Sequence, residues 1–163
     1  MNKKYYLFLK IINETSPRLI SFGLLLLRCT LGILLFIAGS GKLFGWFSGY
    51  GIKATLEGFS KIGISIPLIY LSLYTEFLGG LLITIGLLTR PAAFAVMINM
   101  LVATLITLPN GFMGPTGAQT PFMFLVIDIV ILLCGPMSFS LDTLFFKENG
   151  KSLIRYQTTK IKN

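Results

Sequence analysis

Four long apolar stretches alternate with short polar ones along the chain, at about residues 19–39, 66–88, 91–108 and 121–137. An α-helix rises 1.5 Å per residue, so roughly 20 apolar residues cross the ~30 Å hydrocarbon core of a bilayer. The first two stretches reach that length, the third is close to it, and the fourth needs its flanking residues. The pattern predicts an all-α membrane protein, a bundle of four transmembrane helices that forms a single domain over residues 1–163.

Prolines mark where these stretches begin. Pro17, Pro67, Pro91 and Pro121 each stand at the start of one stretch, where the missing backbone N–H costs nothing. None of the four stretches has a proline in its middle, where one would break the helix. The lengths and the proline positions together favour membrane helices over a soluble bundle of buried helices.

The basic residues indicate an orientation. Lysine and arginine concentrate before the first stretch and after the last, and Arg90 lies in the short turn between the second and third. The loop at 109–120 carries no charge. Under the positive-inside rule both termini are expected in the cytoplasm. Lys10 interrupts the N-terminal apolar run, so we expect no cleaved signal peptide.

The loop between the first two stretches contains an amphipathic segment at about residues 52–62. Its apolar positions, spaced for one helical face, are Ile52, Leu56, Phe59 and Ile62. Its charged positions, four residues apart on the other face, are Lys53, Glu57 and Lys61. This spacing predicts a short helix on the outer membrane surface, in the first extracytoplasmic loop.

One polar side chain lies near the middle of each apolar stretch: Arg28, Glu76, Asn99 and Asp128. Charged groups inside a bilayer are costly, and they usually face the bundle interior and pair with one another. We therefore expect a buried polar cluster at mid-membrane in which Arg28 pairs with Glu76 or Asp128. One arginine cannot balance two carboxylates, so the surplus acid is expected to be protonated or to exchange a proton. A structural latch that fixes the order of the helices is the other interpretation.

Two further expectations concern the same helices. Gly32, Gly79, Gly80 and Gly86 are expected to let helices pack closely, as small residues do in membranes. Lys42, near the end of the first stretch, is expected to extend toward the lipid headgroups.

Composition excludes several kinds of chemistry for this chain alone. It contains no histidine, which excludes His-ligated haem and a Ser-His-Asp triad. Cys29 and Cys134 form no CxxC motif and fit as small buried apolar residues. We assign no metal site and no catalytic residue. No basic patch interleaved with aromatic residues indicates nucleic-acid binding.

Three motifs resemble the DoxX family of small four-helix membrane proteins. The first contains Arg28, Gly32, Phe36, Gly39 and Lys42; the others are "EFLGGLLITIGLLTR" at 76–90 and "GPMSFSLD" at 135–142. The resemblance implies a bacterial cytoplasmic-membrane protein linked to redox metabolism. Its relatives include subunits of quinol oxidase or thiosulfate:quinone oxidoreductase, and components of complexes that resist oxidative or thiol stress.

Three functions remain open from the sequence. The first, which the resemblance favours, is a membrane subunit of a quinone-linked or stress-protective redox system, either non-catalytic or in contact with the quinone. In that case no cofactor is held firmly, quinone is the expected ligand, and soluble or membrane redox proteins are the partners alongside the lipid bilayer. The second is a transporter or permeation module for a small solute or protons. The third is a structural anchor that recruits soluble redox enzymes.

Overall fold

The computed structural model describes residues 17–135 and 140–142, and regular structure in them is helical. The α-helices are α2 (Pro17–Phe44), α3 (Gly51–Lys61), α4 (Ile66–Ile85), α5 (Thr89–Thr107) and α6 (Gln119–Cys134). Two short 3₁₀ turns, η1 (Trp46–Ser48) and η2 (Leu108–Asn110), follow α2 and α5. The prediction of an all-helical fold is confirmed for the described residues. The lysines of both termini, on which the predicted orientation depends, lie outside them.

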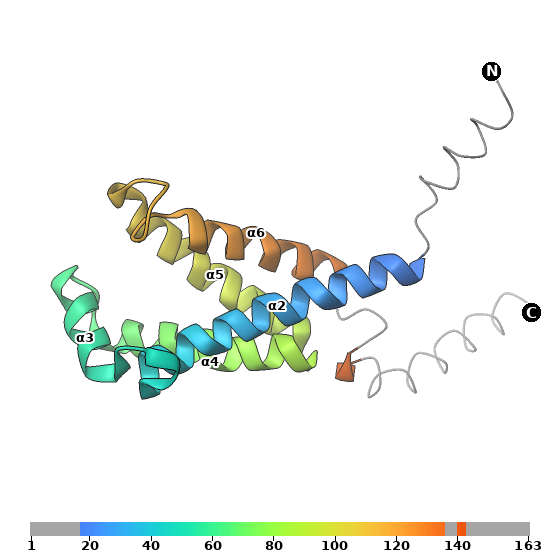
Figure 1. Cartoon of the computed structure of the whole chain (residues 1–163), viewed down its shortest axis with the longest axis horizontal. Coiled ribbons are helices and arrows are strands. Elements are labelled where there is room, and N and C mark those ends of the chain that lie inside the picture. The colour runs from blue at the N-terminus through green and yellow to red at the C-terminus, as the bar shows by residue number, and fades with distance from the viewer. Residues whose placement is uncertain (1–16, 136–139, 143–163) are drawn as a thin grey trace, which may run out of the picture.

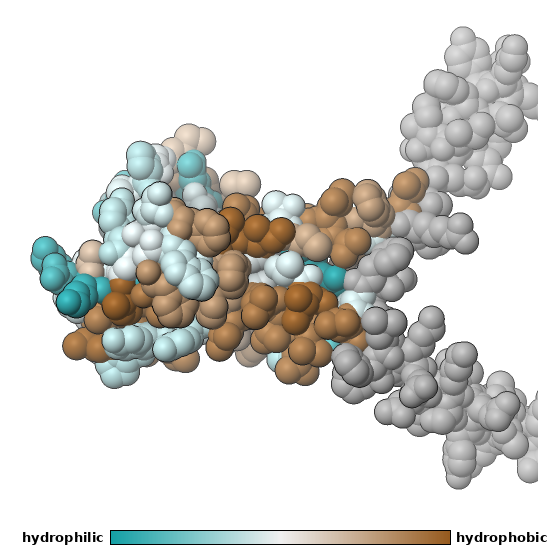
Figure 2. All heavy atoms as spheres, turned by 60° about the horizontal axis from the view of Figure 1, so that its bottom comes forward, coloured by the Kyte–Doolittle hydropathy of each residue, from teal (hydrophilic) through white to brown (hydrophobic). Residues whose placement is uncertain are grey.

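Among the residues that the structure describes, three helical segments are long and apolar enough to cross a membrane: Leu19–Phe44, Ile66–Ile85 and Thr89–Asn110. Helix α6 is also apolar, but its 16 residues rise only about 24 Å. Large apolar side chains are exposed on every one of these helices, for example Leu26, Leu71, Leu105 and Leu133. Figure 2 shows this apolar surface in brown over the described helices. A lipid environment accounts for such a surface.

The helices form two antiparallel pairs. Helix α2 packs mainly on α4, and α5 packs mainly on α6 (Figure 1). Contacts between α4 and α5 join the pairs. The start of α2, the α4–α5 turn and the end of α6 lie at one end of the bundle, here called the α4–α5 end. Helix α3 and the loop between α5 and α6 lie at the opposite end.

Glycines bring the backbones of α2 and α4 into direct contact. A Cβ atom on Gly32 would lie 2.7 Å from the Gly80 carbonyl oxygen, and one on Gly80 would lie 2.6 Å from the Phe36 nitrogen. Further along, a Cβ atom on Gly39 would lie 2.6 Å from the Phe77 nitrogen. No side chain larger than hydrogen fits at these three positions without moving a helix. The register between α2 and α4 is therefore tightly fixed.

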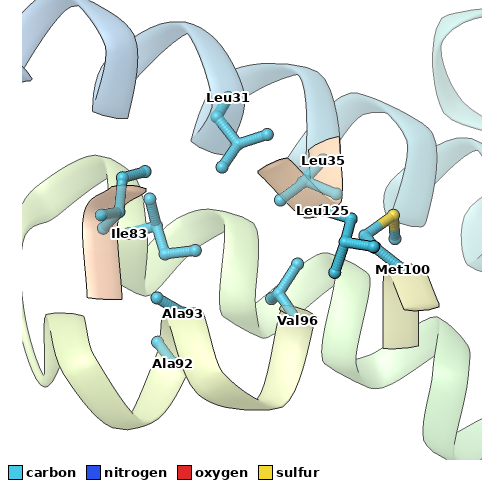
Figure 3. Close-up of a cluster of buried hydrophobic side chains, with 9 residues drawn as sticks. Leu31, Leu35, Ile83, Ala92, Ala93, Val96, Met100 and Leu125 are labelled. Carbon is cyan, nitrogen blue, oxygen red and sulfur yellow. The ribbon is translucent and has the colours of Figure 1, made fainter. Parts of the chain in front are cut away.

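The main apolar core lies between the two pairs of helices (Figure 3). It is built from Leu31 and Leu35 of α2, Ile83 of α4, Ala92, Ala93, Val96 and Met100 of α5, and Leu125 and Ile131 of α6. Gly79, another of the predicted packing glycines, leaves room for the side chain of Val96 where α4 meets α5. Every long helix thus contributes to one continuous core.

Helix α3 corresponds to the amphipathic helix predicted over 52–62. Its apolar residues Ile52, Leu56 and Phe59 pack against a second, smaller core of Leu43, Ile69 and Leu73. Its charged residues are exposed, and teal side chains gather at this end of the molecule in Figure 2. Helix α3 is therefore held by the ends of α2 and α4, in addition to any contact with lipid.

Candidate functional site

The predicted cluster residues do not meet at one level. Arg28, Glu76 and Asp128 are all buried, with 5%, 5% and 0% of their surfaces exposed. However, the register of α2 on α4 places Arg28 beside Gly86, where a Cβ atom would lie 2.8 Å from its Nη1 atom. Glu76 lies about 15 Å from Gly86 along the axis of α4. Arg28 is thus at the α4–α5 end of the bundle, while Glu76 is halfway along α4.

Glu76 pairs with Lys42. The Lys42 ammonium group donates hydrogen bonds to both carboxylate oxygens of Glu76, at 2.8 Å to Oε1 and 2.6 Å to Oε2. The Glu76 side chain is 6% exposed and the Lys42 side chain 34% exposed. The predicted pairing of Arg28 with Glu76 is therefore wrong, as is the expectation that Lys42 extends to the headgroups. The physical reason is that α2 continues to Phe44, so Lys42 lies within the helix and beside the middle of α4.

The loop after α2 folds back against the backbone of the last turns of α2. Gly45 adopts a left-handed conformation with φ of 75° and reverses the chain direction. The backbones of Gly41 and Gly49 then lie in direct contact. The Thr55 hydroxyl group of α3 donates to the Gly51 carbonyl at 2.8 Å and to the Lys42 carbonyl at 3.3 Å. Helix α3 is thereby tied to the turn of α2 that carries Lys42.

Four aromatic rings of α2, α4 and η1 contact one another in a row, here called the aromatic row. Phe36 stacks on Phe77 with ring centroids 5.0 Å apart, and Phe77 meets Phe44 edge-on at 5.5 Å. Phe44 in turn lies 5.1 Å from Trp46. Phe77 is the chain neighbour of Glu76, and Phe44 and Trp46 are about half exposed. The aromatic row therefore leads from the α2–α4 contact to the surface of the described residues.

Arg28 lies near a different carboxylate, that of Asp142. Asp142 accepts hydrogen bonds from the Leu88 N–H at 2.7 Å, the Thr89 N–H at 2.9 Å and the Thr89 hydroxyl at 2.8 Å. Its own N–H donates to the Gly86 carbonyl at 3.0 Å. Since α5 begins at Thr89, Asp142 caps the N-terminus of α5 from a segment beyond α6.

The charge of Asp142 is favoured by this setting. Burial acts to raise the pKa of Asp142, but the hydrogen bonds from Thr89 and Leu88 and the nearby Arg28 charge outweigh it. The pKa of Asp142 is held below its ordinary value of 3.8 as a result. Reasoning from the sequence missed this residue. The signal was present, because Thr89 and Asp142 each lie at the end of a motif shared with the DoxX family, Thr89 as its last residue but one and Asp142 as its last.

Asp128 and Asn99 belong neither to the Lys42–Glu76 ion pair nor to the group of Arg28 and Asp142. Asp128 is fully buried on α6, and within the described part of the chain neither of its carboxylate oxygens has a hydrogen-bond partner. The predicted pairing of Arg28 with Asp128 is therefore not formed. The Asn99 amide donates a long hydrogen bond of 3.4 Å to the Ser72 carbonyl. Burying the Asp128 carboxyl group costs free energy, and no contact among the described residues offsets that cost.

Among residues 17–135 and 140–142, no group of three or more His, Cys, Asp or Glu side chains could hold a metal ion. Cys29 and Cys134 are both free thiols, half-buried and exposed respectively. The buried ionisable side chains of the described residues are those of Arg28, Glu76, Asp128 and Asp142.

Comparison with known proteins identifies the family. The family described as DoxX matches residues 23–109, a little more than half of the chain. The chain belongs to the DoxX family. The matched region covers most of α2 and all of α3, α4 and α5, and it includes Arg28, Lys42 and Glu76. Asp128 and Asp142 lie beyond it.

Two DoxX-like relatives extend the comparison. The chain is 30% identical over 131 residues to "Putative oxidoreductase CatD" of Bacillus subtilis (strain 168). The matched stretch covers 78% of this chain and 92% of that protein. It is 35% identical over 98 residues to "Uncharacterized membrane protein Rv3486" of Mycobacterium tuberculosis (strain ATCC 25618 / H37Rv), over 52% of this chain and 60% of that one. No solved structure matches the chain.

Proposed function

We propose that this DoxX-family membrane protein is a subunit of a quinone-linked redox system that protects against oxidative or thiol stress. The observation that carries the proposal is the Lys42–Glu76 ion pair, which lies halfway along a membrane-capable helix. Ionisable groups inside membrane segments are expensive and commonly mark sites of ligand or proton handling. The name of the Bacillus subtilis relative, which describes an oxidoreductase, agrees with a redox role.

The chain itself contains no histidine and no CxxC motif, so we propose that a partner protein supplies the electron carrier. A bound quinone would exchange electrons with that partner. This chain would hold the quinone at a fixed depth in the membrane. Lys42 would offer it a hydrogen-bond donor, and Glu76 would offer it an acceptor. The donor set fits, because a quinone carbonyl accepts a hydrogen bond and a hydroquinone O–H donates one.

We further propose four membrane crossings in the bacterial cytoplasmic membrane, with α6 and its flanking residues forming the fourth. Both termini would then be cytoplasmic and α3 extracytoplasmic. Lys53→Cys on α3, in a background without Cys29 and Cys134, tests the orientation. An impermeant maleimide should label this cysteine in intact cells, and labelling only after cell lysis would contradict the proposed topology.

The redox proposal is tested by purification in mild detergent followed by mass spectrometry of co-purifying proteins and quinones. The wild type is expected to carry a redox protein and a quinone, and Lys42→Met/Glu76→Gln is expected to lose the quinone. The matched control is Lys53→Met/Glu57→Gln, which removes the same charges from the exposed face of α3. The proposal fails if neither a redox protein nor a quinone is enriched over an unrelated helical membrane protein.

A further inference from the structure

Asp128 differs from the other buried acids in having nothing to stabilise a negative charge. Three acidic side chains are buried in the part of the chain that the structure describes. Glu76 accepts two hydrogen bonds from Lys42, and Asp142 accepts three from the start of α5. Asp128 is 0% exposed, and neither of its oxygens has a partner among the described residues. A carboxylate buried in this way costs far more free energy than the uncharged acid does.

The surroundings of Asp128 are apolar. Leu125 and Ile131 lie three residues before and after it on α6, and both belong to the main core. Residues three apart share a face of an α-helix, so Asp128 faces this core as well. The other helices contribute only apolar side chains to it, namely Leu31, Leu35, Ile83, Ala92, Ala93, Val96 and Met100 (Figure 3). These side chains offer a carboxylate neither a hydrogen-bond donor nor a positive charge.

The charges on the neighbouring helices lie elsewhere. Helix α6 packs mainly on α5 and to a smaller extent on α2. The charged side chains described on these two helices are Arg90 of α5, and Arg28 and Lys42 of α2. Arg90 is exposed and lies against the residue that follows α6, about 10 Å along the axis from Asp128. Arg28 lies at the α4–α5 end, and Lys42 belongs to the ion pair. The Cys29 thiol lies roughly 120–160° around α2 from its core residues, at 100° per residue.

A proton is the ligand that this setting fits. A metal ion needs several ligand atoms, and within the described part of the chain no group of His, Cys, Asp or Glu side chains could supply them. An anionic ligand would add a second negative charge to the core. A proton needs no ligand besides the carboxylate of Asp128, and it removes the charge that the core cannot stabilise.

We infer that Asp128 is a proton-binding site in the core of the bundle, which holds its proton at neutral pH and releases it when the packing of α6 on α5 opens. Opening is required because the side chain is 0% exposed, so water reaches it only after the helices separate locally. Once the proton has left, the carboxylate favours the open arrangement, because there it is hydrated. Asp128 thereby couples the release of a proton to a movement of α6. The site goes beyond the proposed function, because it involves neither the Lys42–Glu76 pair nor a quinone.

Infrared spectroscopy tests this inference, because an uncharged carboxylic acid and a carboxylate absorb at different frequencies. Asp128 and Asp142 are the two aspartates of the chain, so ¹³C at the side-chain carboxyl carbon of aspartate shifts the bands of these two groups. The full-length protein is measured in lipid nanodiscs with and without this label. At neutral pH we expect one acid band, from Asp128, and one carboxylate band, from Asp142.

Two matched variants assign the bands. Asp142→Asn should remove the carboxylate band and leave the acid band. Asp128→Asn should do the opposite, and it should fold as the wild type does, because its amide has nearly the size of the uncharged acid and carries no charge. If Asp128→Asn does not fold, Asp142→Asn still decides the assignment, because Asp128 is then the single aspartate of the chain.

Release of the proton is followed by raising the pH. The acid band of Asp128 should fall reversibly while a carboxylate band rises. Over the same pH range the backbone amides of α6 should exchange hydrogen about tenfold faster relative to those of α4, as α6 opens. The amides of α4 serve as the reference because amide exchange itself accelerates with pH.

Three results would overturn the inference. A carboxylate band from Asp128 at neutral pH would show that the group is charged and paired. An acid band that persists at every pH at which the protein stays folded would show a permanently uncharged acid. A band that titrates without any change in the exchange of α6 relative to α4 would refute the coupling to α6. None of these results depends on whether a quinone or a redox protein co-purifies, so they are separate from the outcome for the proposed function.

Discussion

Removing Lys42 alone should destabilise the protein far more than removing Lys42 and Glu76 together. Lys42→Met leaves the Glu76 carboxylate, 6% exposed, without its partner. Breaking a buried ion pair in this way typically costs 3–5 kcal/mol. We expect about 3 kcal/mol, the low end, because the Lys42 side chain is one-third exposed and the pair is therefore only partly buried.

The other two variants complete the cycle. Glu76→Gln leaves Lys42 without its carboxylate partner, but the long Lys42 side chain can bend toward the surface. We therefore expect a loss of about 1.5 kcal/mol in the free energy of unfolding. The double variant buries no charge and should cost about 1 kcal/mol. The resulting coupling energy is about 3.5 kcal/mol. It is of the same size as the ~4 kcal/mol attraction of two unit charges about 4 Å apart at an effective dielectric constant of about 20.

Reversible unfolding by SDS in mixed micelles, followed by Trp46 fluorescence, measures these values. The exposed pair Lys53 and Glu57, four residues apart on α3, serves as the control and should couple by no more than about 0.5 kcal/mol. If the effects of the Lys42 and Glu76 substitutions add to within about 0.5 kcal/mol, the two charges do not interact in the membrane. The central contact described here would then be refuted.

Other substitutions test the remaining features. Gly80→Val should lower the free energy of unfolding by about 3 kcal/mol or more, because the added side chain forces α2 away from α4. Gly23→Ala is the control: a Cβ atom there meets no atom within 4 Å, so this substitution should stabilise the protein by about 0.5 kcal/mol. Equal unfolding midpoints of the two variants would disprove the close contact. Asp128→Leu should be neutral or stabilising by about 1 kcal/mol, because it removes a buried carboxyl group without a described partner, and a clear destabilisation would show that a partner exists. The pKa of Asp142 is lowered on folding, so its stabilisation is complete above about pH 5 and is lost as the pH falls through the folded-state pKa. A pH titration of unfolding should lose this component in Asp142→Asn, and identical pH profiles would contradict it.

The sequence was sufficient to place the helices but not to pair them. Proline positions and apolar lengths predicted α4 and α5 to within a few residues, because both signals act within one helix. The predicted end of the first helix at residue 39 was five residues short of Phe44. That error moves the middle of the helix by only about 2 Å. Arg28 is not level with Glu76 because Gly32 lies against Gly80, a register that puts Arg28 beside Gly86. Gly45, which is left-handed and directly follows Phe44, is the local signal for the true end, and the prediction did not use it.

The contacts of the site depend on the register between helices, which periodicity does not determine. Gly32 and Gly80 fix how α2 slides along α4, and this sets Lys42 opposite Glu76. A spacing of glycines identifies the faces that approach each other, but not which glycine lies on which. The contact of Asp142 with Thr89 joins residues more than fifty positions apart, so only the three-dimensional structure reveals it.

The cap on α5 has a consequence for how the protein is made. Chains are synthesised from the N-terminus, at about 5–20 residues per second. The α4–α5 hairpin is therefore complete several seconds before the ribosome reaches Asp142. Until then the Leu88 and Thr89 amides must bond to water or lipid headgroups. The hairpin is therefore made before the cap on the N-terminus of α5 exists. The segment that contains Asp142 supplies this cap only after it has been translated.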